Sequence, residues 1–314
     1  MKARFLKHSH PEKSTEPEEI VDLPVSFQFR VVNGDPDSPA NGSAPQSGAR
    51  KGLRSARILV AEDNIVNQDV ALAILRKLGA RVELAGNGLE ALAALRSGDY
   101  DLVLMDCEMP EMDGYEATRR IRDAETGVRN PQVPVIAFTA DAVSGDREKC
   151  FEAGMNDYLA KPVDPGRLAE VLEKWILRRE PTQEVGSRGT AIFEPDAMPI
   201  FDAGAMLDRM MGDRLLARKV IGGFLREAPR QMSALGKSLR QGDAAEVRLQ
   251  AHSMKGGAAT IAAERLREPC GAMEEAAAVG DLERAAEWMP KVEEQLELLA
   301  ETLRREGWVE ASLA

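Results

Sequence analysis

The sequence has little of several residue types that mark particular classes of protein. Of its 314 residues only three are cysteines and three are histidines, and aromatic side chains make up 4%. The cysteines, Cys107, Cys150 and Cys270, are odd in number and far apart. They therefore fit neither a disulfide framework nor the spacing of zinc ligands, and a reducing cytoplasm is their simplest setting.

Positive charge and long apolar runs are lacking as well. The formal net charge is −11, which argues against the basic stripe that a nucleic-acid-binding surface needs. No apolar run approaches the roughly 18 residues that span a bilayer, and the N-terminus lacks the apolar core of a signal peptide. We therefore expect no direct contact with nucleic acid, no membrane span and a cytoplasmic location.

The first 54 residues have the composition of a mostly disordered segment. They are rich in Pro, Ser, Asp, Glu, Gly and Asn, so residues 1–54 offer little apolar surface to bury. One exception is VSFQFRV at 25–31, where apolar and polar residues alternate as in a short strand. No partner strand lies near it in the sequence.

From Arg57 onward, short apolar runs alternate with stretches that have a helical pattern. Five runs separated in this way predict βαβ units, and hence a doubly wound α/β domain with a five-stranded parallel sheet over residues 55–178. The predicted strands are RILVA, RVELA, DLVLM, VPVIAF and DYLA, and the predicted helices are 65–78, 88–97, 113–123, 143–152 and 165–178.

A second, all-helical domain follows a linker at residues 179–199. Within residues 200–308 there is no strand pattern, and apolar residues recur at helical spacing, which predicts an antiparallel four-helix bundle. Glycine can end a helix and aspartate can cap the next one. Three such pairs separate the predicted helices: Gly212–Asp213, Gly242–Asp243 and Gly280–Asp281. As a coil, the linker would span on the order of 25 Å.

Charged and polar side chains follow the predicted strands of the first domain. Glu62 and Asp63 end the first strand, and Asp106 ends the third. If these strands are neighbours, three carboxylates converge and call for a cation such as Mg²⁺. Lys161 and Thr139, after the fifth and fourth strands, add a positive charge and a hydroxyl donor. Singly, each would be read as a solvated loop residue, but together they could hold a phosphoryl group on Asp106.

The segments ILVAEDNIVNQ, DLVLMDCEMPEMDGYEATRRIR, PVIAFTADA and DYLAKPV resemble the response regulator receiver domain across residues 56–178. The resemblance implies a flavodoxin-like fold with Asp106 as the phosphoacceptor. It implies a Mg²⁺ site made by Glu62, Asp63, Asp106 and the backbone carbonyl of Glu108. It implies that Thr139 and Tyr158 are the switch pair and that Lys161 contacts the phosphate. Ala140, a small residue after the fourth strand, leaves room for the phosphoryl group. Asn64 and Asn67 are of the kind common in receivers attached to hybrid kinases, and Glu62 stands where many receivers carry Asp.

The stretch AHSMKGGA at 251–258 places two glycines in a predicted helix over 243–261. Each costs about 1 kcal/mol relative to alanine in a helix interior. The apolar stripe of this helix predicts that His252 faces outward, with Lys255 one turn along and a gap at Gly256. We interpret this as an exposed imidazole that can carry a phosphoryl group, open to a partner's active site. The competing interpretation is a surface histidine on a small-residue packing face.

The wider pattern over about 201–305 resembles the histidine phosphotransfer (HPt) domain, through FDAGAMLDRMMGDRLLARKVIGGFLREAPRQMSAL, GDAAEVRLQAHSMKGGAATIAAERL and AVGDLERA. The resemblance implies that His252 is phosphorylated and that Lys255 and Gly256 belong to the phosphotransfer surface. Thr260 and Ala262 stand where Asn and Gly are frequent, and Pro269 interrupts the following helix, where it is expected to bend it.

We therefore expect a cytoplasmic phosphorelay protein. A sensor histidine kinase would donate to Asp106, and His252 would exchange the group with Asp106 and with a downstream response regulator receiver. The chain is expected to be a phosphocarrier without its own ATP-binding module, since 54 residues leave no room for one and no P-loop occurs. One alternative is the C-terminal part of a hybrid sensor histidine kinase, because VSFQFRV faintly resembles the last strand of an ATP-binding domain. Another is a non-catalytic protein-docking module.

Overall fold

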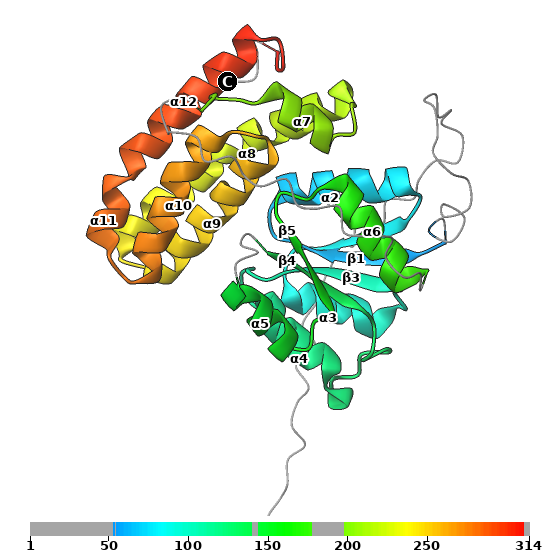
Figure 1. Cartoon of the computed structure of the whole chain (residues 1–314). Coiled ribbons are helices and arrows are strands. Elements are labelled where there is room, and N and C mark those ends of the chain that lie inside the picture. The colour runs from blue at the N-terminus through cyan, green and yellow to red at the C-terminus, as the bar shows by residue number, and fades with distance from the viewer. Residues whose placement is uncertain (1–52, 54, 140–143, 178–197, 311–314) are drawn as a thin grey trace, which may run out of the picture.

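The computed structural model describes residue 53 and residues 55–139, 144–177 and 198–310. The predicted strand at 25–31, the rest of the N-terminal segment and nearly all of the predicted linker lie outside these residues. Two bodies stand beside one another, an α/β body drawn in blue to green and a helical body drawn in yellow-green to red (Figure 1). The predicted fold classes of both domains are confirmed.

The first body is built on five parallel strands in the order β2-β1-β3-β4-β5. They are β1 (Arg57–Ala61), β2 (Arg81–Ala85), β3 (Leu102–Asp106), β4 (Val135–Thr139) and β5 (Asp157–Ala160). Every residue of β3 and β4 is buried, as expected for central strands covered on both faces. Because β1 pairs with β3, the carboxylates that follow these two strands lie at the same edge.

Helices cover both faces of this sheet (Figure 1). One face carries α2 (Ile65–Leu78) and α6 (Pro165–Ile176). The other face carries α3 (Gly88–Ser97), α4 (Gly114–Arg122) and α5 (Ser144–Glu152), with a short 3₁₀ helix, η1 (Ala124–Thr126), after α4. The thiols of Cys107 and Cys150 are 3.8 Å apart on this second face, a proximity that their sequence spacing did not indicate.

The second body contains α7 (Ala203–Arg209), α8 (Arg214–Gln241), α9 (Ala244–Thr260), α10 (Glu264–Ala278), α11 (Leu282–Glu287) and α12 (Met289–Arg305). Helices α8, α9, α10 and α12 contact one another in a ring, which makes the four-helix bundle. The three Gly-Asp breaks are confirmed: each glycine has a positive φ, and each aspartate side chain accepts a hydrogen bond from the first turn of the next helix. Helix α10 runs on through Pro269 and α8 runs on through Pro229.

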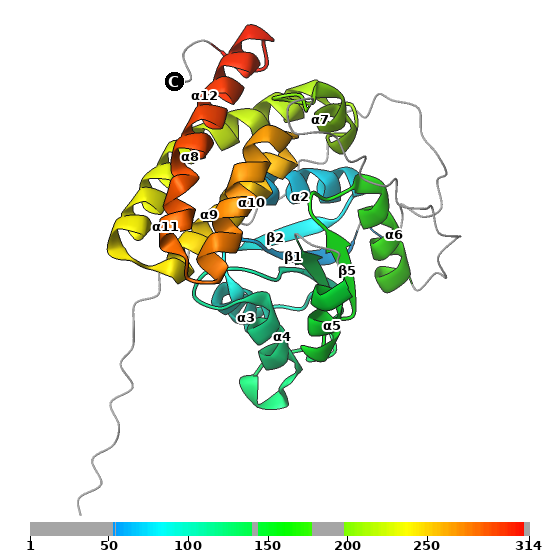
Figure 2. The same cartoon turned by 60° about the vertical axis from the view of Figure 1, so that its left-hand side comes forward.

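The two bodies share one apolar cluster. It runs from the α2 and α6 side of the sheet into the bundle, where it includes Phe224, Ala258 and Ile261. Helix α2 contacts both α8 and α9, and Figure 2 shows α2 lying behind α9 and α10. The first turn of α2, which closely follows Glu62 and Asp63, therefore packs against the bundle. Among the described residues, none of the helices combines the length and apolar character needed to cross a membrane.

Candidate functional site

The acidic side chains predicted from the strand ends do converge. Carboxylate oxygens of Glu62, Asp63 and Asp106 all lie within 4.8 Å of one another. Lys161 reaches into the cluster, with Nζ 2.5 Å from Asp106 Oδ2 and 2.7 Å from Glu62 Oε2. Both carboxylates and the ammonium group are almost fully buried. Among the described residues, three acidic groups therefore lie around the ammonium group of Lys161.

The excess of negative charge shifts the pKa values of these groups. Burial, followed by the charge of Glu62, raises the pKa of Asp63 to about 6. The same two causes raise the pKa of Asp106, although Lys161 opposes them. Burial lowers the pKa of Lys161, but the charges of Asp106 and Glu62 outweigh it, so that the net shift is upward and the group stays cationic. Oxygen donors with excess negative charge are the donor set that Mg²⁺ prefers, so these residues fit that ion.

Of the remaining residues of the predicted phosphate site, Thr139 and Tyr158 lie on β4 and β5. Thr139 is buried at the end of β4, where its carbonyl accepts a hydrogen bond of 2.7 Å from the Lys161 amide. Tyr158 on β5 is half-buried, and the Arg147 guanidinium lies 5.4 Å from its ring centre. Ala140 lies outside the described residues. The switch roles of these residues stay predictions.

The predicted outward orientation of His252 is wrong, because only 7% of the residue is exposed. The apolar stripe correctly identified one buried face of α9, but a second face is covered as well. Helix α10 packs alongside it and brings the carboxylate of Glu274 to 2.7 Å from His252 Nδ1. From the other domain, Glu108 Oε2 lies 3.6 Å from the same nitrogen. Helical periodicity alone could not reveal these two neighbours.

Glu274 fixes the chemical state of His252. A carboxylate can only accept, so in the neutral imidazole the proton is on Nδ1 and the lone pair is on Nε2. Lys255 Nζ is 3.1 Å from the other oxygen of Glu274 and holds that carboxylate in place. Burial lowers the pKa of His252, but the hydrogen bond to Glu274 and the charge of Glu108 outweigh it, so the net shift is upward.

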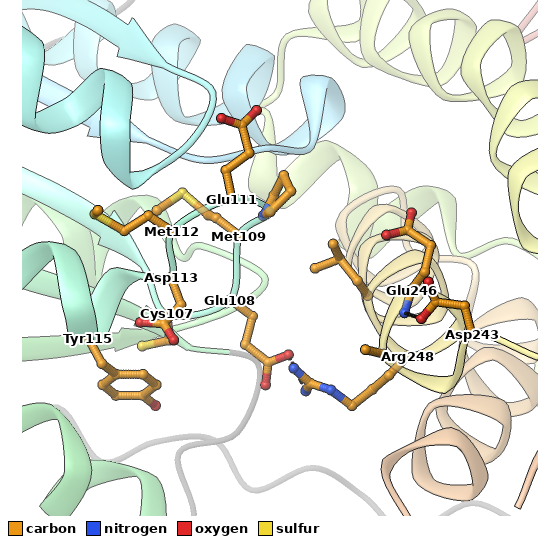
Figure 3. Close-up of a pocket in the computed structure, with 13 residues that line it drawn as sticks. Cys107, Glu108, Met109, Glu111, Met112, Asp113, Tyr115, Asp243, Glu246 and Arg248 are labelled. Atoms are coloured by element: carbon orange, nitrogen blue, oxygen red, sulfur yellow. Dashed lines mark hydrogen bonds and ion pairs between the residues drawn. The ribbon is translucent and has the colours of Figure 1, made fainter. Parts of the chain in front are cut away.

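Glu108 joins the two predicted centres. Its backbone amide donates a hydrogen bond of 3.2 Å to Asp106 Oδ1, while its side chain points across to Arg248 on α9 at 2.5 Å. Figure 3 shows these two side chains pointing toward one another. Both line a cavity of about 440 Å³. The cavity lies between the β3–α4 loop and the first turns of α9. The structure thus brings His252 to the loop that follows Asp106.

Sequence reasoning missed Glu274 and Arg248 as members of this site. Glu274 lies on a different helix from His252, and no local pattern connects residues 22 positions apart on two helices. Helical spacing does place Arg248 on the face of α9 that carries His252, but it assigns the residue no role in the site. Its partner on the other domain could not have been found in this way.

Comparison with protein families supports both resemblances. Residues 58–173 match the family model described as response regulator receiver domain, and residues 219–306 match the model described as Hpt domain. The virulence sensor protein BvgS of Bordetella pertussis is 31% identical over 260 residues, which are 82% of this chain and 21% of BvgS. The sensor histidine kinase GacS of Pseudomonas protegens is 29% identical over 220 residues, which are 69% of this chain and 24% of GacS. The chain therefore spans about a quarter or less of the length of these relatives.

Two solved structures are also similar. The receiver domain of sensor histidine kinase PA1611 from Pseudomonas aeruginosa, described with a magnesium ion in its active-site cleft, is 52% identical. It has a TM-score of 0.36 and is matched over 39% of this chain and 98% of that one. A complex of the Saccharomyces cerevisiae phosphotransfer protein Ypd1 with the receiver of Ssk1 gives 34% identity and a TM-score of 0.37, over 39% of this chain and 90% of that one. The two family matches show that the chain joins a response regulator receiver domain to an Hpt domain, the domains of two-component phosphorelay signalling.

Proposed function

We propose that Asp106 and His252 are the two phosphorylated residues and that they exchange the phosphoryl group within one chain. The observation that carries this proposal is the position of Glu108, whose amide contacts Asp106 and whose carboxylate lies 3.6 Å from His252 Nδ1. One residue, through its backbone amide and its side chain, contacts both centres, which supports exchange across the loop that follows Asp106. Such an arrangement supplies the proximity that phosphoryl transfer depends on.

In the transfer to the bundle, His252 Nε2 attacks the phosphorus of the acyl phosphate on Asp106. The P–N bond forms as the P–O bond breaks, and the electron pair remains on the Asp106 carboxylate, where Lys161 stabilises it. The Nδ1 proton stays in its hydrogen bond to Glu274, which stabilises the positive charge on the imidazole. The reverse reaction uses the same groups. When an external phosphohistidine phosphorylates Asp106, a P–O bond forms on Asp106 as the P–N bond of the donor breaks.

Glu62, Asp63, Asp106 and the Glu108 carbonyl are the groups that would hold Mg²⁺. When bound, the ion would neutralise charge on the phosphoryl oxygens, which is the main requirement of this chemistry. The external partners that fit are a sensor histidine kinase as donor and a second receiver as acceptor. The cytoplasmic location expected from the sequence is part of the same proposal.

The test labels Asp106 with acetyl phosphate and Mg²⁺ and follows the label to His252 across a dilution series. Transfer within one chain has a rate independent of protein concentration, and His252→Gln should prolong the life of the acyl phosphate. The control mixes labelled His252→Gln chains with unlabelled Asp106→Asn chains, where transfer has to occur between molecules. If transfer in the unmodified chain slows on dilution as steeply as in this mixture, exchange within one chain is ruled out.

A second candidate is that the two domains form the C-terminal part of a longer hybrid sensor histidine kinase. The observation that favours it is the small share of the relatives' length that the chain spans, between 21% and 24% for BvgS and GacS. Reading the genomic sequence upstream of Met1 in the same frame tests it. A kinase core encoded there would supply the donor histidine, and a stop codon with no such core would exclude this candidate.

A further inference from the structure

We infer that Asn64 and Asn67 of the receiver bind a stripe of polar residues and glycines on α9. This contact positions Asp106 and His252 for phosphoryl transfer. This inference deepens the proposed function and rests on it. The stripe consists of Ser253, Gly256, Gly257 and Thr260. Their spacing of three, four and seven residues places them on one face of α9, directly beside His252.

Asn64 makes the first half of the contact. Its side-chain oxygen caps α2 by accepting hydrogen bonds from the amides of Val66 and Asn67. This leaves Nδ2 to donate across the interface, 2.8 Å to the carbonyl of Ser253 and 3.0 Å to its hydroxyl. The residue is buried, so these contacts are shielded from water. One side chain therefore serves both as the cap of α2 and as a docking group.

Asn67 makes the second half, one turn further along α2. Its Oδ1 accepts a hydrogen bond of 2.7 Å from the hydroxyl of Thr260, and its Nδ2 donates one of 2.9 Å to Glu62 Oε1. The hydroxyl donor and the carboxylate acceptor together fix which way the amide points. The bundle is thus hydrogen-bonded, through a single amide, to a carboxylate of the proposed metal site.

The glycines create the space that these two amides occupy. A methyl group at Gly256 would lie 3.4 Å from Asn67 Nδ2, and one at Gly257 would lie 3.4 Å from Asn64 Nδ2 and 3.0 Å from the Phe224 ring. Any larger side chain at Gly256 would push α2 away from α9. The stripe and the asparagine pair are therefore complementary in shape as well as in hydrogen bonding.

Thr260 makes this contact specific, because its hydroxyl is the group on the bundle that donates to the Asn67 amide. A threonine hydroxyl donates to Asn67 Oδ1 without bringing a second amide into the interface. The hydrogen bond between Thr260 and Asn67 is therefore a contact that positions this receiver on this bundle. Receivers with another residue at the Asn67 position should fit this bundle less well.

The experiment compares Thr260→Val with Thr260→Ser in the full chain. Valine keeps the shape and removes the hydroxyl, whereas serine keeps the hydroxyl. We expect Thr260→Val to slow transfer from Asp106 to His252 about three- to tenfold, the value of one buried hydrogen bond, and Thr260→Ser to stay within about twofold. Labelling of Asp106 by acetyl phosphate should be unchanged in both variants.

Docking is also measured without phosphate, by hydrogen exchange in the unphosphorylated chain. Segments 62–70 and 250–261 should exchange faster in Thr260→Val than in Thr260→Ser, while segment 133–139 of β4 should be unchanged and thereby show that the fold is intact. In a double-mutant cycle, Asn67→Ala combined with Thr260→Val should slow transfer little more than the worse single variant.

Three results would overturn the inference: additive effects in the cycle, equal losses in the valine and serine variants, or unchanged exchange and transfer in Thr260→Val. A different result, no transfer from Asp106 to His252 even in the unmodified chain, would instead refute the proposed function. The hydrogen-exchange comparison would still decide whether the asparagine pair holds the domains together.

Discussion

Ala262, just after α9, shows how a single residue departs from what its position favours. Its φ is 61°, in the left-handed region where a side chain is strained and where glycine is favoured. The backbone contacts of Ala262 with Ala259 and Asp202 need no side chain. We expect Ala262→Gly to raise the free energy of unfolding by about 0.5–1 kcal/mol.

The neighbouring Ala263 is the matched control for this prediction. It is also buried, but its φ is −106°, a conformation that alanine adopts without strain. Ala263→Gly should therefore lower the free energy of unfolding, by about 1 kcal/mol, because it removes a buried methyl group and gives the unfolded chain more freedom. Chemical denaturation of both variants measures the two changes. Losses of similar size in both would show that the left-handed conformation of Ala262 carries no strain.

Glu274 provides a second prediction at the scale of single residues. The pKa of His252 is raised above its ordinary value of 6.5, and only unprotonated imidazole has a free lone pair. The transfer rate should therefore rise with pH through that raised pKa. Glu274→Gln should move the rise to lower pH, because it removes a negative charge from His252, and should reduce the rate at high pH about tenfold.

Glu275 is the control, since it is the next residue on α10 and its side chain is exposed. Glu275→Gln should leave both the pH profile and the maximal rate unchanged. Rates of transfer between Asp106 and His252 measured from pH 6 to 9 test the pair of variants. A profile that stays in place in Glu274→Gln would show that this carboxylate does not control the protonation of His252.

At the scale of elements, α9 contains Gly256, which weakens the helix, at the point where α2 approaches. We expect Gly256→Ala to stabilise the bundle by about 1 kcal/mol and to leave transfer nearly unchanged, because its methyl group would sit 3.4 Å from Asn67. Gly256→Leu would drive a longer side chain into the first turn of α2. Transfer should then fall about tenfold or more while the bundle stays folded.

Thermal unfolding and the transfer rate, measured on both variants, separate helix stability from docking. Equal transfer rates in the alanine and leucine variants would show that the missing side chain has no role in access. In that case the glycine would reflect packing within the bundle alone, which is the competing interpretation of the AHSMKGGA stretch.

Local patterns predicted most of the elements. The five strands were placed to within two residues, and the Gly-Asp pairs marked three helix boundaries, since both features depend on neighbours in sequence. Two results escaped these patterns. Helix α10 continues through Pro269, and the His252 face of α9 is buried by α10 and by the receiver. The second result depends on contacts such as Asn64 with Ser253, which are 189 residues apart.

At the scale of the whole molecule, the acidic cluster should make stability depend on Mg²⁺ and pH together. Because the pKa values of Asp63 and Asp106 are raised, the folded state holds protons that the unfolded chain loses near pH 4. The contribution of these groups to stability therefore falls as pH rises through about 4 to 6 and beyond. Mg²⁺ should reverse this loss by binding the ionised carboxylates.

We therefore expect the increase in melting temperature caused by Mg²⁺ to be larger at pH 8 than at pH 5.5. Thermal unfolding with and without the ion at both values measures it. Asp63→Asn is the comparison variant, because it lacks one of the three carboxylates, and its Mg²⁺-induced increase should be smaller. An increase of the same size at both pH values would show that Mg²⁺ binding does not depend on ionisation of these carboxylates.

The burial of His252 against its own receiver also affects the rate at which phosphoryl groups pass through the molecule. The face of α9 beside His252 can be occupied by one receiver at a time, so the attached domain is a competitive inhibitor of every external one. If the attached domain occupies the face 90% of the time, the apparent dissociation constant of an external receiver rises about tenfold. Tighter docking would thus speed delivery to His252 and delay departure from it. The dwell time of the closed pair, rather than the chemistry, would then set the output of the relay.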